Sequence, residues 1–89
     1  MTAEWPQLYG QALERTAEAV LSLTDEEVER VLDLARVVAH GSERRYAPLA
    51  AYLAGKFVSE RSASGVPPPD ALADAFATAE ALLAGWPPA

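Results

Sequence analysis

The chain has 89 residues, of which 51% are hydrophobic and 22% charged, and its formal net charge is −6. At this length residues 1–89 form one domain, and a single histidine with no cysteine excludes disulfides and a structural zinc site. The acidic balance excludes nucleic acid as the expected partner, since a nucleic-acid binder needs Lys and Arg to neutralise phosphates.

The first expected helix runs over about residues 5–23. Its inward-facing positions follow the 4-3-4-3 spacing of a helix packed in a bundle, and they are Tyr9, Leu13, Thr16, Val20 and Leu23. Gly10 permits a close approach of another helix at this point. We therefore expect this face to be buried in the core.

The second expected helix runs over about residues 25–40. Thr24 followed by Glu27 is a capping box, and acids fill the positively polarised first turn. Gly41 is suited to end the helix, where His40 complements the dipole. The expected inner stripe is Val28, Val31, Leu32, Ala35, Val38 and Ala39.

Two further helices are expected over about residues 48–61 and 70–84. Pro48 suits the first helical position, and Gly55 indicates a tight crossing. A linker over 62–69 joins the two helices, and Gly85 ends the second one. The third helix is expected to bury Leu49, Tyr52, Leu53 and Phe57, and the fourth carries Leu72, Ala75, Phe76, Ala79, Leu82 and Leu83.

Four amphipathic helices joined by short loops predict an all-α fold, a small up-down-like four-helix bundle. This topology brings the start of the first helix, the junction of the second and third, and the end of the fourth to one end of the molecule. The side chains expected to cluster there are Trp5, His40, Arg44, Arg45, Tyr46 and Trp86.

Two polar groups near this junction are candidate binding sites. Asp33, Arg36 and His40 recur at helical spacing, either as an oxyanion-binding row or as a surface ion pair beside a helix-capping histidine. Arg44 and Arg45 precede a helix start without a capping side chain, which offers free N–H groups to a phosphate or carboxylate. The same arginines are equally suited to pair with acids of neighbouring helices.

Two apolar features can likewise be interpreted either as binding surfaces or as structural elements. Trp5 and Trp86 are either a pair that stacks on a ligand or a hydrophobic lid over a small core. The alanine-rich helix over 70–84 either packs on a second subunit or another domain, or is simply a well-propagating helix.

Support for catalysis is thin. Ser59, Ser62 and Ser64 lie in or near a polar linker with no second histidine, and no glycine-rich phosphate loop follows a strand. We therefore expect no enzyme and no cofactor. No apolar stretch approaches membrane-spanning length, and Met1–Trp5 lacks the basic flank and apolar core of a signal peptide. The expected location is the cytoplasm, with no membrane partner.

A resemblance enters through Leu32–Gly41, Arg44, Ala47–Leu49 and Tyr52–Gly55. These residues resemble the core of a small actinobacterial helical domain family of unknown function, found alone or fused to proteins like the molybdenum cofactor guanylyltransferase. Arg45 and Tyr46 depart from its pattern, where a proline and a small residue are expected. The resemblance implies an accessory role near molybdenum cofactor or nucleotide metabolism, with no catalytic residue to carry over.

Together these observations predict a non-catalytic accessory or interaction domain that binds another protein domain or a second copy of itself. Its functional face is expected at residues 40–48. The alternative is a small anion-binding module in which Arg44, His40 and the start of the third helix hold a phosphate-like group.

Overall fold

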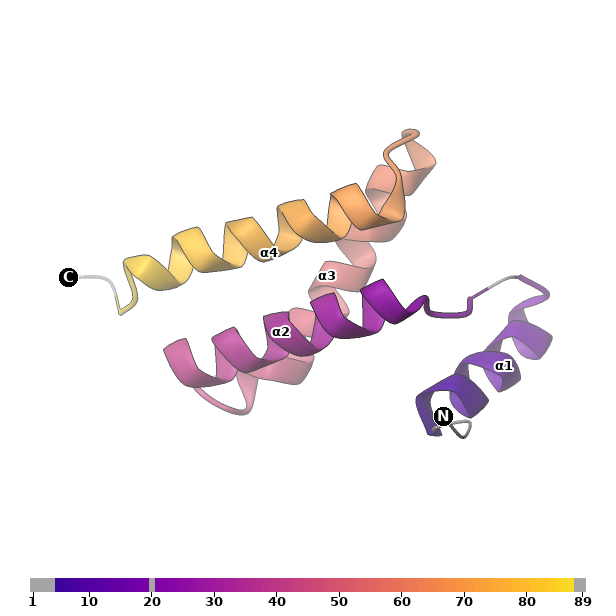
Figure 1. Ribbon diagram of the computed structural model, residues 1–89, viewed down its shortest axis with the longest axis horizontal. Helices are drawn as coiled ribbons and strands as arrows, with labels where there is room; N and C mark the ends of the chain where they lie inside the picture. Colours follow the sequence, from indigo (N-terminus) through magenta and orange to yellow (C-terminus); the bar gives the residue numbers. More distant parts are fainter. Residues whose placement is uncertain (1–4, 20, 88–89) are drawn as a thin grey trace.

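The computed structural model describes residues 5–19 and 21–87, which form four helices and no strand. The helices are α1 (Trp5–Ala17), α2 (Asp25–Gly41), α3 (Tyr46–Ala63) and α4 (Pro68–Ala84) (Figure 1). The expected all-α class is therefore confirmed. No helix in the described part of the chain is long and apolar enough to cross a membrane.

The capping box before α2 forms as expected. Thr24 is extended and its hydroxyl accepts the N–H of Glu27, whose carboxylate accepts the N–H of Thr24. This reciprocal pair fixes the start of α2, as expected.

α1 ends at Ala17, six residues before the expected end at Leu23. Glu18 adopts a left-handed φ of 54°, and the N–H of Ala19 donates to the carbonyl of Glu14 at 3.3 Å. The sequence contains no proline or glycine near residue 18 that would predict the end of a helix, so the expected helix was too long. Val20 of the expected inner face lies outside the described residues.

Both later helices begin earlier than expected. α3 starts at Tyr46, so Pro48 is its third residue, and α4 starts at Pro68. Proline is tolerated at these positions because the first N–H groups of a helix have no intrahelical partner. The expected linker over 62–69 is therefore helical at both ends, since residues 62–63 belong to α3 and residues 68–69 to α4.

The four helices are not packed equally. α2, α3 and α4 each contact the other two in antiparallel succession, whereas no Cα of α1 comes within 8 Å of the other helices (Figure 1). The core is correspondingly a three-helix core, whose buried members are Leu34, Val38, Ala54, Ala71 and Leu72.

One glycine has a packing role in this core. A Cβ on Gly41 would lie 3.1 Å from a methyl carbon of Leu83, so α2 and α4 approach closely there. The tight crossing expected at Gly55 is absent, because a Cβ there would meet nothing within 4 Å. Gly10 likewise faces only the carbonyl of Leu21.

The largest correction concerns which faces are buried. Many side chains expected in the core are exposed, while Leu34 and Ala71, which were not expected there, are buried. The exposed ones are Tyr9, Leu13 and Leu23, then Leu32 of α2, Leu49, Tyr52, Leu53 and Phe57 of α3, and Leu82 of α4. The core is formed instead by Leu34, Val38 and Leu72, together with Ala54 and Ala71.

Candidate functional site

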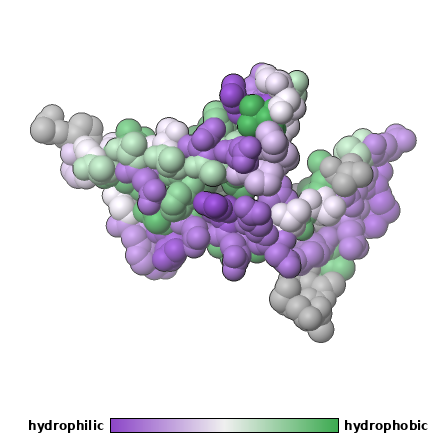
Figure 2. All heavy atoms as spheres, turned by 45° about the horizontal axis from the view of Figure 1, so that its top comes forward, coloured by the Kyte–Doolittle hydropathy of each residue, from purple (hydrophilic) through white to green (hydrophobic). Residues whose placement is uncertain are grey.

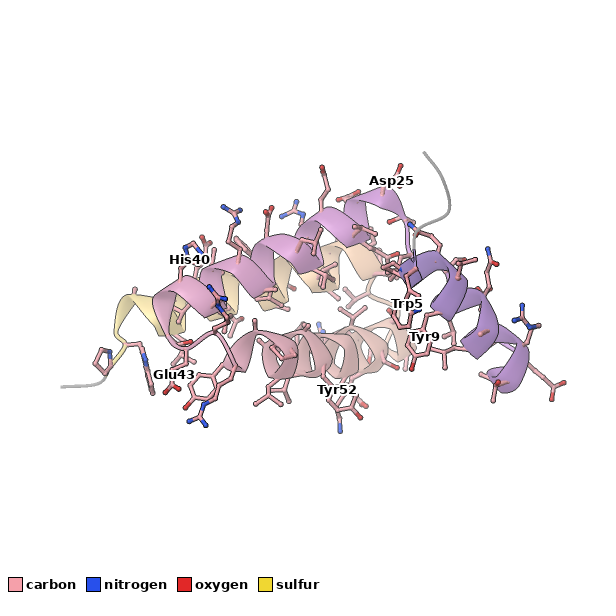
Figure 3. The ribbon with its side chains drawn as sticks, turned by 90° about the horizontal axis from the view of Figure 1, so that it is seen from below. Trp5, Tyr9, Asp25, His40, Glu43 and Tyr52 are labelled. Atoms are coloured by element: carbon pink, nitrogen blue, oxygen red, sulfur yellow. The ribbon has the colours of Figure 1, made fainter. Side chains whose placement is uncertain are left out.

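The expected junction cluster forms only in part. The end of α2, the start of α3 and the end of α4 meet at one end of the molecule, where Tyr46 and Trp86 line one hollow. Trp5 lies toward the other end of the molecule, where α2 begins, and away from His40 and Glu43 (Figure 3). The expected pairing of Trp5 with Trp86 is therefore wrong, and Trp5 stacks on Tyr9 instead, with ring centroids 4.9 Å apart.

The charged candidates lie on the surface. Among residues 5–19 and 21–87 two ion pairs occur, Arg36 with Asp33 at 2.6 Å and Arg45 with Glu43 at 3.0 Å. Both pairs are at least half exposed, so each contributes little to stability. Asp33–Arg36 has the geometry of a helix-surface pair, and His40 is exposed in the last turn of α2.

The start of α3 offers an anion few donors. The N–H of Tyr46 donates to the carbonyl of Glu43 at 2.9 Å, and the N–H of Ala47 to that of Arg44 at 3.1 Å. Pro48 has no N–H. Two of the backbone N–H groups expected there are therefore engaged and a third position has none, while the side chains of Arg44 and His40 are exposed.

A different feature dominates the same face of the molecule, an apolar groove between α3 and α4. Two adjoining hollows of about 300 and 280 Å³ share four lining residues, so they form one continuous groove. The shared residues are Ala50 and Leu53 of α3 and Ala79 and Leu82 of α4. Leu53 and Leu82 remain 64% and 70% exposed, so the walls of the groove are largely uncovered.

The groove runs along most of α3. Tyr46 and Trp86 line one end, and Phe57 and Thr78 line the other. Leu34 and Val38 of α2 contribute to its lining from the core, so the groove opens on the side of α3 and α4 that faces away from α2. Its lining is apolar except for Ser42, Thr78 and the polar atoms of the aromatic side chains.

Apolar and polar side chains lie on different parts of the molecular surface. Hydrophobic atoms gather over α4 toward its C-terminal end, and hydrophilic atoms cover the lower side, where α2 lies (Figure 2). No group of three or more metal-ligating side chains occurs in the part of the chain that the structure describes.

Sequence reasoning missed this groove although it named its walls. Leu49, Leu53, Phe57 and Leu82 were selected as core residues on apolar periodicity alone. Periodicity reports that a face avoids water, and it does not distinguish a face covered by the same chain from one covered by another chain. The apolar periodicity of these residues was recognised, but it was assigned to the core and not to an exposed groove.

Comparison with known proteins places the chain in a family without assigning an activity. No curated protein and no solved structure matches it. A family profile described as "Domain of unknown function (DUF6457)" matches residues 1–89, which is the whole chain. The protein therefore belongs to the DUF6457 family of domains of unknown function.

Proposed function

We propose that this domain is a non-catalytic interaction module whose groove between α3 and α4 binds the apolar face of an amphipathic helix. The observation that carries the proposal is the uncovered groove itself, walled by Leu53 and Leu82. Because its lining is almost entirely apolar, such a groove selects a partner by shape and apolar contact. A helix that presents apolar residues at i, i+3, i+4 and i+7 meets this requirement.

The groove is also a continuous apolar surface, shared by α3 and α4. Single exposed leucines are common on soluble domains, whereas contiguous apolar patches mark sites of interaction. Here the exposed side chains are adjacent across two helices and enclose hollows of about 300 and 280 Å³. This continuity, more than the exposure of any one residue, supports a binding role.

The anion-binding alternative has less support. Its expected backbone donors at the start of α3 are engaged by Glu43 and Arg44 or removed by Pro48, and Arg45 is paired with Glu43. The accessory role near molybdenum cofactor or nucleotide metabolism is supported by the resemblance over residues 32–55 alone, and it stays a prediction about setting.

The proposal is tested with a designed amphipathic helix unrelated to this chain, about 14 residues long, with leucines at i, i+3, i+4 and i+7. Titrated into the isotopically labelled domain, it should shift the NMR signals of Leu53, Ala79 and Leu82. Leu53→Glu should weaken binding at least about tenfold, because a buried carboxylate would face the apolar helix.

Leu32→Glu is the matched control, because Leu32 is 63% exposed against 64% for Leu53 but lies on α2, outside the groove. It should leave peptide affinity within about twofold of wild type. Equal losses in the two variants, or signal shifts scattered outside the groove, would show that the groove is not the binding site.

A further inference from the structure

The chain exposes more surface than a compact monomer of its size. Its accessible area is 6701 Å², whereas a folded monomer of 9.5 kDa exposes about 5,000 Å². The radius of gyration is 14.1 Å against about 12 Å for a compact chain of this length. Two features contribute to this exposed area: α1, which packs on no other helix, and the uncovered groove.

α1 itself is built to be covered. Its large apolar residues, Trp5, Leu8, Tyr9 and Leu13, lie at i, i+3, i+4 and i+8, which is one face of a helix. None of them is buried. An isolated helix of 13 residues is marginal in water, so most of its stability must come from packing of this face.

The dimensions of α1 and the groove agree. Thirteen residues give a helix about 20 Å long, and the groove follows α3 from Tyr46 to Phe57, about 17 Å. Trp5, Leu8 and Tyr9 supply the large side chains that hollows of about 300 and 280 Å³ can receive.

Charge also matches between the two surfaces. Residues 1–29 carry seven acids and one base, whereas residues 30–61 carry six bases and three acids. Glu14 near the C-terminal end of α1 and Glu18 just after it have a counterpart in Arg44, just before α3, whereas Arg45 is paired with Glu43. A docked α1 would thus run antiparallel to α3, with Trp5 toward Phe57.

α1 does not reach the groove of its own chain, because it contacts neither α3 nor α4. Directly after α1, Glu18 is left-handed, and the N–H groups of Ala19 and Leu21 donate to Glu14. The segment between α1 and α2 ends at the capping box of Thr24. α1 lies beyond the start of α2 (Figure 1), whereas the groove opens on the side of α3 and α4 that faces away from α2.

We infer that two copies of this chain exchange their N-terminal helices, each α1 seating in the groove between α3 and α4 of the other copy. This inference rests on the proposed function, since it names the helix that the groove binds. Reciprocal exchange makes two identical contacts about a two-fold axis, so the assembly closes as a dimer. Each copy has about 1,700 Å² of excess surface, and together they fall within the 2,000–5,000 Å² that obligate dimers bury.

The test combines sedimentation equilibrium with variants on both sides of the contact. Wild type at about 50 µM should have twice the 9.5 kDa chain mass. Leu8→Glu on α1 and Leu53→Glu in the groove should each weaken dimerisation at least about 100-fold, and Leu32→Glu should leave it unchanged. Circular dichroism checks that every variant keeps its helical content.

Mixing the two defective chains provides the decisive arm. The Leu53→Glu chain still has a wild-type α1, and the Leu8→Glu chain still has a wild-type groove, so an equimolar mixture should form a heterodimer through one intact contact. Recovery of dimer on mixing supports exchange. A dimer lost with Leu53→Glu but kept with Leu8→Glu would instead show groove-to-groove pairing and overturn the inference.

Failure of the exchange can be separated from failure of the proposed function. If exchange occurs, Leu8→Glu empties the groove, so this chain should bind the designed peptide at least about tenfold more tightly than wild type. A monomeric wild type that binds the peptide as tightly as Leu8→Glu does overturns exchange and leaves the groove's function intact. A monomeric wild type that binds no peptide overturns both.

Discussion

The two sides of the capping box at Thr24 differ in what holds their helices in place. After it, α2, α3 and α4 share a core in which Ala71 is fully buried and every helix contacts the other two. Before it, α1 has a well-formed apolar face with no buried residue. Both regions have the apolar periodicity of packed helices. The periodicity therefore predicts a helix with one apolar face, whereas the tertiary structure determines which other element buries that face.

Hydrogen exchange should show the largest difference between the two regions. In dilute solution, at about 1 µM, amides of α1 should exchange at least about 1,000-fold faster relative to their intrinsic rates than amides near Leu34 in α2. The α2 amides open only with the whole core, whereas α1 opens alone. Mass spectrometry of exchanged peptides resolves the two regions.

Concentration extends this measurement. If α1 is covered by a second copy, its protection should rise at about 100 µM while that of α2 stays nearly constant. Protection of α1 equal to that of α2 at the lowest concentration would show that α1 packs on its own chain, and the contrast between the regions would then be lost.

Truncating one leucine on each side should give the next largest effect. Leu34 is 3% exposed at the centre of the core, so Leu34→Ala should lower the free energy of unfolding by about 2–4 kcal/mol. Leu13→Ala in α1 should lower it by less than about 0.5 kcal/mol in dilute solution, because that side chain contributes no buried surface to the core. Urea unfolding followed by circular dichroism measures both, and similar values would contradict a core limited to α2–α4.

How far the sequence predicts this molecule also differs between its parts. The four helices, the capping box at Thr24 and the end of α4 at Gly85 were predictable because each depends on local chemistry within a few residues. The break at Glu18 was not, since it depends on a left-handed residue and on hydrogen bonds to Glu14 that no local motif announces.

The candidate site shows the same limit. Tyr46 and Trp86 were expected near one another and are, because the antiparallel order of α2, α3 and α4 follows from their short loops. The groove was not expected, because Leu53 and Leu82 were assigned to the core. Distinguishing a buried face from an interface requires knowing which side chains the core holds, and here Leu34, Val38 and Leu72 occupy it together with two alanines.

A smaller effect is expected at the boundary between the regions. Thr24→Ala removes the hydroxyl that accepts the N–H of Glu27, so it should lower the free energy of unfolding by about 1 kcal/mol. Thr16→Ala removes a hydroxyl that donates to the carbonyl of Ala12 within α1, and it should change that free energy by less than about 0.3 kcal/mol. Thermal or urea unfolding compares the pair, and an equal loss in Thr16→Ala would mean that α1 unfolds together with the core.

The smallest effect should be a gain, at Gly55. This residue lies inside α3, and a Cβ there would meet nothing within 4 Å, so Gly55→Ala should raise the free energy of unfolding by about 0.5–1 kcal/mol through helix propensity alone. Gly41→Val, by contrast, should lower it by about 1–3 kcal/mol, because added carbons would press on Leu83 where α2 meets α4. Gly55 lies outside the groove lining, so its variant should also leave the association of two copies unchanged. A loss of stability in Gly55→Ala would reveal a contact on this face of α3, and a loss of dimer without a loss of stability would extend the interface beyond the groove.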